Sequence, residues 1–163
     1  MLDQQLEFEY TASPEESKEC KLFYERIFAK KIKLFEVVRD KERQLKGQDY
    51  IIHFEDNTIV RVDHKVRETD YGDIALEKYA KLHLKQEGWL SDSLDTDYIV
   101  YVIKPTRKVY MLPFFKLRTV WKNNMVEWSK KYPNKTSSKG NNGYETLCIC
   151  IPVEVIKEAI QTL

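Results

Sequence analysis

Two runs of alternating apolar and polar residues, separated by only three residues, constrain this chain more than any other feature. The runs are residues 49–54 and 58–67, and such alternation is typical of half-buried β-strands. Residues 55–57 join them, and Asn57 tolerates the left-handed backbone conformation that the last residue of a three-residue hairpin loop adopts. We therefore predict a β-hairpin.

The loop length also predicts the register of this hairpin. It pairs Ile52 with Val60 and Tyr50 with Val62, which places all four on one apolar face. The same register places Asp49 directly opposite Asp63, and the Cβ atoms of opposed residues lie about 4.5–5.5 Å apart. Lys65 follows two residues later, on the face that carries Asp63.

Two neighbouring carboxylates repel each other unless a cation lies between them. Lys65 supplies part of this positive charge, and a divalent metal would supply the rest. Mg²⁺ prefers one or two carboxylates together with waters and phosphate oxygens, and Mn²⁺ is an alternative. A metal held in this way activates water and neutralises charge that develops on phosphorus, so the pattern suits phosphodiester hydrolysis.

A purely structural interpretation remains open for the same residues. Asp49, Asp63 and Lys65 could form a solvent-facing salt-bridge cluster, worth about 0–1 kcal/mol per ion pair. This alternative explains the alternation equally well, but it does not explain why two acids oppose each other.

Asp49, the hairpin and the tripeptide Asp63-His64-Lys65 together resemble the PD-(D/E)XK nuclease superfamily. In that family an Asp at the start of one strand and an acid-X-Lys motif in the next form the active site. The resemblance covers about residues 17–112, and residues 63–77 also resemble uncharacterised nuclease-like proteins of bacteria and phages. Two departures are Gln48, where Pro is usual, and Asp63, where Glu is commoner.

The resemblance implies a restriction-endonuclease-like fold, in which helices flank a mixed β-sheet, and Mg²⁺-dependent cutting of DNA. It implies that Asp49 and Asp63 bind the metal, joined by the backbone carbonyl of His64. It also implies that Lys65 positions water or phosphate. The side chain of His64 points to the apolar side of its strand, so we expect it in the core.

Glu77 is a weaker catalytic candidate. We predict a helix over residues 74–86, and in PD-(D/E)XK proteins the corresponding helix often lends a polar residue to the site. The alternative is that an acid in the first turns of a helix is simply favourable there.

Charge is distributed unevenly along the chain, although the net charge is only +1. Residues 104–139 contain ten Lys and Arg against one acid, Glu127, which predicts a phosphate-binding stripe, with a solvated helix face as the open alternative. Arg61 and Arg67 flank the acidic pair and are further phosphate candidates, with a surface ion pair as the alternative. The predicted nucleic-acid contacts are Arg61, Arg67, Lys104, Arg107, Lys108, Lys116, Arg118 and Lys122.

The remaining pattern predicts an α/β (α+β) protein with a mixed sheet and a single domain over residues 1–163. Further helices are expected at 17–35, 114–131 and 152–163, strands at 34–43, 98–103, 109–112 and 145–151, and a loop at 133–143. No run of about 18 apolar residues exists and the acidic N-terminus does not read as a signal peptide. Three cysteines cannot all pair within the chain, so an intracellular, cytoplasmic setting is expected.

We therefore predict a Mg²⁺-dependent DNA endonuclease, with RNA as an alternative substrate and a homodimer left open. The competing interpretation is a non-catalytic module on the same fold, which binds nucleic acid or a protein partner.

Overall fold

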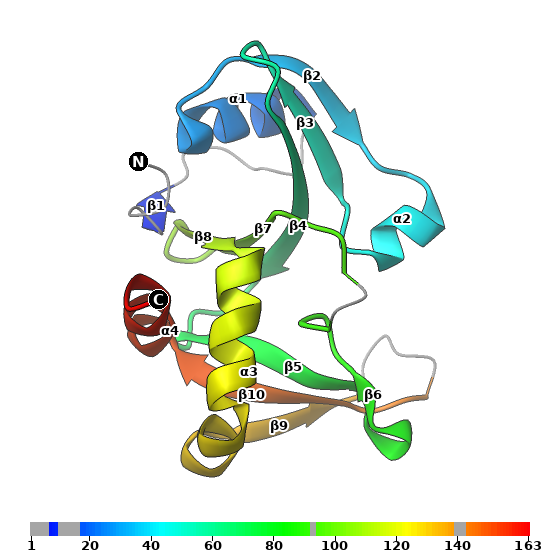
Figure 1. The fold of residues 1–163 in the computed structure, drawn as a ribbon, viewed down its shortest axis with the longest axis vertical. Helices are drawn as coiled ribbons and strands as arrows, with labels where there is room; N and C mark the ends of the chain where they lie inside the picture. The colour runs from blue at the N-terminus through cyan, green and yellow to red at the C-terminus, as the bar shows by residue number, and fades with distance from the viewer. Residues whose placement is uncertain (1–6, 10–16, 92–93, 139–142) are drawn as a thin grey trace. The chain divides into compact units, whose positions relative to one another are not determined.

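The computed structural model describes residues 7–9, 17–91, 94–138 and 143–163, and the chain divides into two compact units. Unit 1 comprises Met1–Asp70 and Asp95–Phe114, and unit 2 comprises Tyr71–Leu94 and Phe115–Leu163. The described part contains two β-sheets and four α-helices (Figure 1), so the protein is of the mixed α+β class.

A six-stranded mixed sheet, in the order β1-β8-β7-β4-β3-β2, forms the framework of unit 1. Neighbouring strands are antiparallel except β4 and β7, which run parallel. Their bounds are Glu7–Glu9 for β1, Ile32–Val37 for β2, Tyr50–Phe54 for β3, Ile59–Arg67 for β4, Tyr98–Ile103 for β7 and Lys108–Pro113 for β8.

The predicted hairpin is confirmed, and its predicted register holds as far as the pair of Tyr50 and Val62, beyond which Asp49 and Asp63 form no ladder pair. β3 pairs with β4 so that Ile52 opposes Val60 and Tyr50 opposes Val62. Asn57 has a φ of 66°, the left-handed conformation expected at the end of the loop. The backbone N–H of Phe54 donates to the carbonyl of Thr58 over 2.9 Å and closes the turn.

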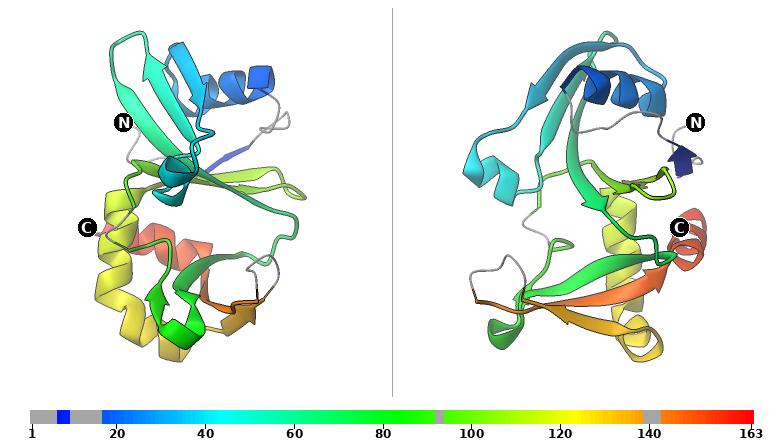
Figure 2. Two further views of the ribbon diagram at one scale, coloured as in Figure 1. Left: turned by 90° about the vertical axis from the view of Figure 1, so that its right-hand side faces the viewer. Right: turned by 180° about the vertical axis from the view of Figure 1, so that it is seen from behind.

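Helix α1 (Ser17–Phe28) covers one face of this sheet (Figure 2). Its buried side chains recur at helical spacing, and they pack on alternate residues of the strands, which is the period expected for one face of a sheet. The core they share includes Cys20, Phe23, Tyr24, Ile27 and Phe28 from α1 with Ile52, Phe54, Val60, Val62, Val100, Val102, Val109 and Met111.

Two elements near the start of unit 1 differ from the prediction. The helix expected over 17–35 ends at Phe28, because Ala29 adopts a left-handed φ of 51° and β2 begins at Ile32. The strand expected over 34–43 stops at Val37, and helix α2 (Lys41–Leu45) follows. The carboxylate of Asp40 caps α2 by accepting from the N–H of Arg43 over 2.8 Å.

An antiparallel four-stranded sheet, in the order β6-β5-β10-β9, forms the framework of unit 2. Helix α3 (Phe114–Lys131) passes across this sheet (Figure 1), and helix α4 (Val153–Gln161) follows β10. The strands are β5 (Asp73–Lys81), β6 (Gln86–Glu87), β9 (Asn134–Ser137) and β10 (Thr146–Pro152), and a short 3₁₀ helix, η1 (Leu82–Leu84), follows β5.

The helix predicted over residues 74–86 is wrong, because this segment is strand β5 followed by η1 and β6. Ile74 and Leu76 are fully buried while their neighbours are less so, which is a two-residue period. The partner of this strand is β10, which pairs Ile149 with Leu76 and Ile151 with Ile74. Tertiary pairing thus overrides the helix propensity of this Ala-, Leu-, Glu- and Lys-rich segment.

Helix α3 forms where it was predicted. Leu117, Val120, Trp121 and Trp128 are buried and share one helical face. The predicted closing helix is also confirmed as α4, whereas the loop expected over 133–143 contains strand β9 and, in part, lies outside the described residues.

No helix in the described part of the chain is long and apolar enough to cross a membrane. The three cysteines, all within the described residues, form no disulfide bond, and Cys20 and Cys150 are buried. Burial raises the pKa of Cys20 to about 11, although a hydrogen bond with Tyr50 opposes the rise.

Candidate functional site

The candidate site of unit 1 begins at Asp49, the residue just before β3. Its backbone N–H donates over 2.9 Å to the carbonyl of Val62, the residue that also pairs with Tyr50. The pairing of β3 with β4 ends here, so the next N–H along that edge of β4 lacks a strand partner. The carboxylate of Asp49 takes this place, because its Oδ2 accepts from the N–H of His64 over 2.8 Å.

Asp63 and Lys65 lie in β4, on either side of His64, whose N–H binds Asp49. Asp63 is only 6% exposed, and β7 flanks it through the parallel pairing with Ile99. The ammonium of Lys65 lies 3.2 Å from Oδ1 and 3.0 Å from Oδ2 of Asp63. The lysine therefore binds both oxygens of a nearly buried carboxylate.

The pKa of Asp63 is raised above its ordinary value. Burial is the main cause, because it penalises the charged carboxylate. Lys65 opposes this rise, while the nearby charge of Asp49 adds to it. Lys65 therefore does not compensate fully for burying one acid beside another.

This arrangement suits a divalent cation in its donor chemistry. Asp49 and Asp63 offer hard oxygen ligands, and the unbalanced negative charge favours a cation beside them. Among the described residues no group of three or more His, Cys, Asp or Glu side chains is placed to hold a metal. Mg²⁺ is commonly held by one or two carboxylates, with waters and substrate phosphate completing its shell.

His64 projects its ring to the opposite face of β4, into the aromatic core, as predicted. Nδ1 of the ring lies 2.6 Å from the hydroxyl of Tyr24, which is fully buried. Phe23 and Tyr50 also pack edge-on against this ring. The side chain of His64 thus anchors β4 to α1, while its N–H holds Asp49.

Arg61 is held by two carboxylates, which favours the ion-pair alternative over phosphate binding. Its guanidinium contacts Asp97 over 3.1 Å through Nε and 3.0 Å through Nη2, and Nη1 contacts Asp95. The hydrogen bonds with Asp97 are the largest cause of the raised pKa of Arg61. Arg61 therefore ties β4 to the chain that leads into β7.

Gln48 extends this network to the residue just before Asp49. Its side-chain N–H donates to Asp95 over 3.0 Å, and its carbonyl accepts from Arg43 over 3.2 Å. Gln48 is only 6% exposed. Gln48 is therefore a buried amide within a polar network, at the position where the PD-(D/E)XK pattern usually has Pro.

The predicted phosphate contacts divide between the two units. In unit 1, Lys104 pairs with Glu68 over 3.0 Å, and Arg107 adopts a left-handed φ of 55° in the turn between β7 and β8. Arg67 closes β4, where its carbonyl accepts from the N–H of Lys104. Lys108 begins β8, whereas Lys116, Arg118 and Lys122 belong to α3 in unit 2.

Glu77 lies on β5 in unit 2, not on a helix, so it is not among the residues that unit 1 brings together. Sequence reasoning missed Tyr24, Gln48, Asp95 and Asp97. Pairing of distant residues carries no local signal, and the only trace of this network in the sequence is that Asp95 and Asp97 directly precede the strand at 98–103.

Comparison with known proteins finds no matching family model, no matching curated protein and no matching solved structure.

Proposed function

We propose that unit 1 carries a Mg²⁺-dependent nuclease site that hydrolyses phosphodiester bonds of DNA. The observation that carries this proposal is the pairing of Asp63, a nearly buried carboxyl with a raised pKa, with Asp49 and Lys65. Perturbed acids beside a lysine are typical of sites that do chemistry.

The proposed fold is restriction-endonuclease-like. The mixed sheet of unit 1, its parallel β4–β7 pair and the helix α1 on one face support this assignment. The chain between β4 and β7 departs from the expected pattern, because it forms β5, η1 and β6 in unit 2 rather than a helix.

Each residue of the site has a separate role in this proposal. Asp49 and Asp63 would hold Mg²⁺, with the carbonyl of His64 as a further ligand. When bound, the ion would lower the pKa of a coordinated water and stabilise negative charge at phosphorus. Lys65 would orient the attacking water or bind the scissile phosphate, and its contact with Asp63 holds its ammonium at the site.

Helix α3 supplies a second line of support, since it is a basic surface with one acid. Lys116, Arg118, Lys122, Lys130 and Lys131 accompany the single acid Glu127 along this helix. Such a surface fits the phosphates of DNA, and we propose it as a backbone contact.

The test incubates the protein with plasmid, linear and branched DNA in Mg²⁺ or Mn²⁺, beside a Lys65→Ala variant. We expect cutting by the wild type that disappears in the variant and with chelator. Lys33→Ala is the matched control, because Lys33 is an exposed lysine of the edge strand β2 in the same unit. Cutting that survives in Lys65→Ala would contradict the assigned site.

A non-catalytic nucleic-acid-binding module is the second candidate. The observation that favours it is that both carboxylates already have partners within the protein. Asp49 accepts from the N–H of His64, and Asp63 pairs with Lys65, so a structural role alone accounts for both acids. Absence of cutting on every substrate, with binding that weakens as salt rises, would favour this candidate.

A further inference from the structure

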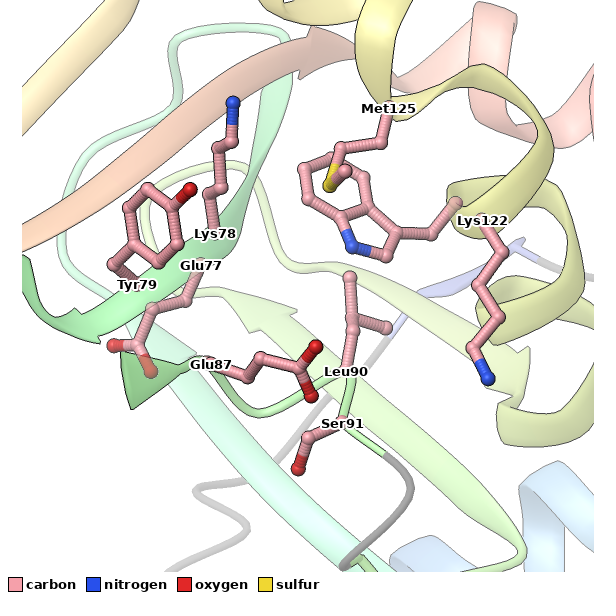
Figure 3. A pocket seen from close by; sticks show the side chains of 10 residues that line it. Glu77, Lys78, Tyr79, Glu87, Leu90, Ser91, Lys122 and Met125 are labelled. Atoms are coloured by element: carbon pink, nitrogen blue, oxygen red, sulfur yellow. The ribbon is translucent and has the colours of Figure 1, made fainter. Parts of the chain in front are cut away.

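Unit 2 contains a pocket of about 220 Å³ that the proposed nuclease site does not use (Figure 3). It lies between strands β5 and β6, the segment that follows β6, and helix α3. Its lining includes Glu77, Tyr79, Glu87, Leu90, Trp121 and Lys122.

The inner wall of the pocket is apolar and aromatic. Trp121 and Leu90 are buried, and Met125 of α3 completes this wall. The ring of Tyr79 lines the pocket from β5. These groups offer flat, apolar contact area to a planar ligand.

The rim of the pocket is charged. Glu87 extends from β6 toward Leu90 and Ser91, as Figure 3 shows. Within the described residues the carboxylate of Glu87 has no hydrogen bond or ion pair, so it is available to accept from a ligand. Lys122 of α3 adds positive charge at the same rim.

Gly88 allows the close approach of β6 to β5 that shapes this side of the pocket. A Cβ atom at this position would lie 2.0 Å from the carbonyl oxygen of Glu77, so only glycine lets β6 approach β5 this closely. The N–H of Gly88 donates to the carbonyl of Lys78 over 3.2 Å and fixes this approach.

A suitable ligand is flat, so that it packs on the aromatic wall. It carries N–H donors on its edge for the carboxylate of Glu87, and an attached phosphate for Lys122. Sites for drug-sized ligands have volumes of roughly 300–1,000 Å³. This pocket is smaller, so its volume suits a ligand with a single ring system. In a duplex the neighbouring bases cover both faces of each base. An unpaired base can instead stack on aromatic side chains. We propose that this pocket binds a single unpaired nucleobase of a DNA strand.

The carboxylate of Glu87 narrows the choice of base to guanine. The Watson–Crick edge of guanine carries two adjacent N–H donors, which one carboxylate accepts together. Adenine and cytosine offer one amino group each on that edge, and thymine offers a single ring N–H. Lys122 would contact the neighbouring phosphate without regard to the base.

This inference deepens the proposed function and rests on DNA being the substrate, since it names single-stranded or unpaired DNA as the preferred form. Recognition of the base does not require cutting, however. Binding is therefore measured with chelator present, so that nuclease activity does not affect the result.

The experiment uses fluorescence anisotropy to measure how tightly the full-length protein binds two labelled single strands of DNA, each nine nucleotides long. One strand is all thymine, and the other has a single central guanine. We expect the guanine strand to bind roughly tenfold more tightly, in line with one bidentate contact. Glu87→Gln should abolish this preference, and Lys122→Ala should weaken binding of both strands equally.

Glu145→Gln is the matched control, because Glu145 is an exposed acid of the same unit outside the pocket. Circular dichroism of each variant verifies its folding. Equal binding of the two strands, or a preference that survives Glu87→Gln, would overturn the proposal. A guanine preference without any DNA cutting would contradict the nuclease proposal alone, and cutting without a preference would contradict the pocket proposal alone.

Discussion

The backbone N–H of His64 donates to the carboxylate of Asp49 over 2.8 Å, so a side chain acts where a neighbouring strand would otherwise pair. The last β3–β4 pair joins Tyr50 to Val62, one step before this contact. Asp49 therefore has two roles, since it completes the hydrogen bonding of β4 and places a negative charge beside Asp63. Substitutions separate these two roles.

Asp49→Ala should destabilise the protein by about 1–3 kcal/mol, because the half-buried N–H of His64 loses its acceptor. Asp49→Asn should cost less, because an amide oxygen still accepts this hydrogen bond. Urea denaturation at neutral pH compares the free energies of unfolding. Equal losses in the two variants would mean that charge, rather than hydrogen bonding, accounts for the contribution of Asp49.

The stability contribution of Asp63 should fall as pH rises. Its pKa in the folded protein is raised above the usual 3.8, so the folded state binds this proton more tightly than the unfolded chain does. The free energy of unfolding therefore decreases between pH 3.8 and the raised value, and stays lower above it. Relative to wild type, Asp63→Asn should gain stability across this window.

Denaturation of Asp63→Asn and wild type at a series of pH values measures this difference. We expect the two proteins to differ least below pH 3.8, where both side chains are neutral. A variant that loses stability relative to wild type as pH rises would contradict the burial argument.

Asp56 should show the opposite pH dependence. This exposed residue of the hairpin loop pairs with Lys30 over 2.7 Å and accepts from the N–H of Thr58 over 2.9 Å. Hydrogen bonding with Lys30 is the main cause that lowers its pKa from 3.8 to about 2. The stabilisation is therefore present above pH 3.8 and is lost as pH falls toward 2.

Asp56→Asn tests this sign in the same denaturation series. The difference from wild type should be constant above about pH 5 and shrink steadily as pH falls through 3.8 toward 2. Added salt should reduce it, because the ion pair with Lys30 is solvent-exposed. A difference that grows on acidification would contradict this assignment.

The hairpin and the closeness of Asp49 to Asp63 were predictable, because both depend on short-range information. Three loop residues and an apolar alternation on each side leave only one register that buries Ile52 and Val60 together. Helix α3 was predictable for the same reason, since its buried residues repeat at helical spacing.

The strand β5 was not predictable from its own residues. Ile74 and Leu76 fit a strand, but the surrounding alanines, lysines and glutamate favour a helix equally. Pairing with β10, about 75 residues away in the chain, decides between the two. The bond between Tyr24 and His64 likewise joins residues 40 positions apart, so no local pattern reveals it.

Gly88→Ala should destabilise the protein by about 3 kcal/mol, because the added Cβ would lie 2.0 Å from the carbonyl oxygen of Glu77 and force β6 away from β5. Gly72→Ala is the control, since its Cβ would meet no atom within 4 Å and only the left-handed φ of 70° opposes it, at about 1–2 kcal/mol. Thermal denaturation compares the two variants. A smaller loss for Gly88→Ala than for Gly72→Ala would show that β6 tolerates displacement, and the tight approach of β6 to β5 would then not set the shape of the pocket.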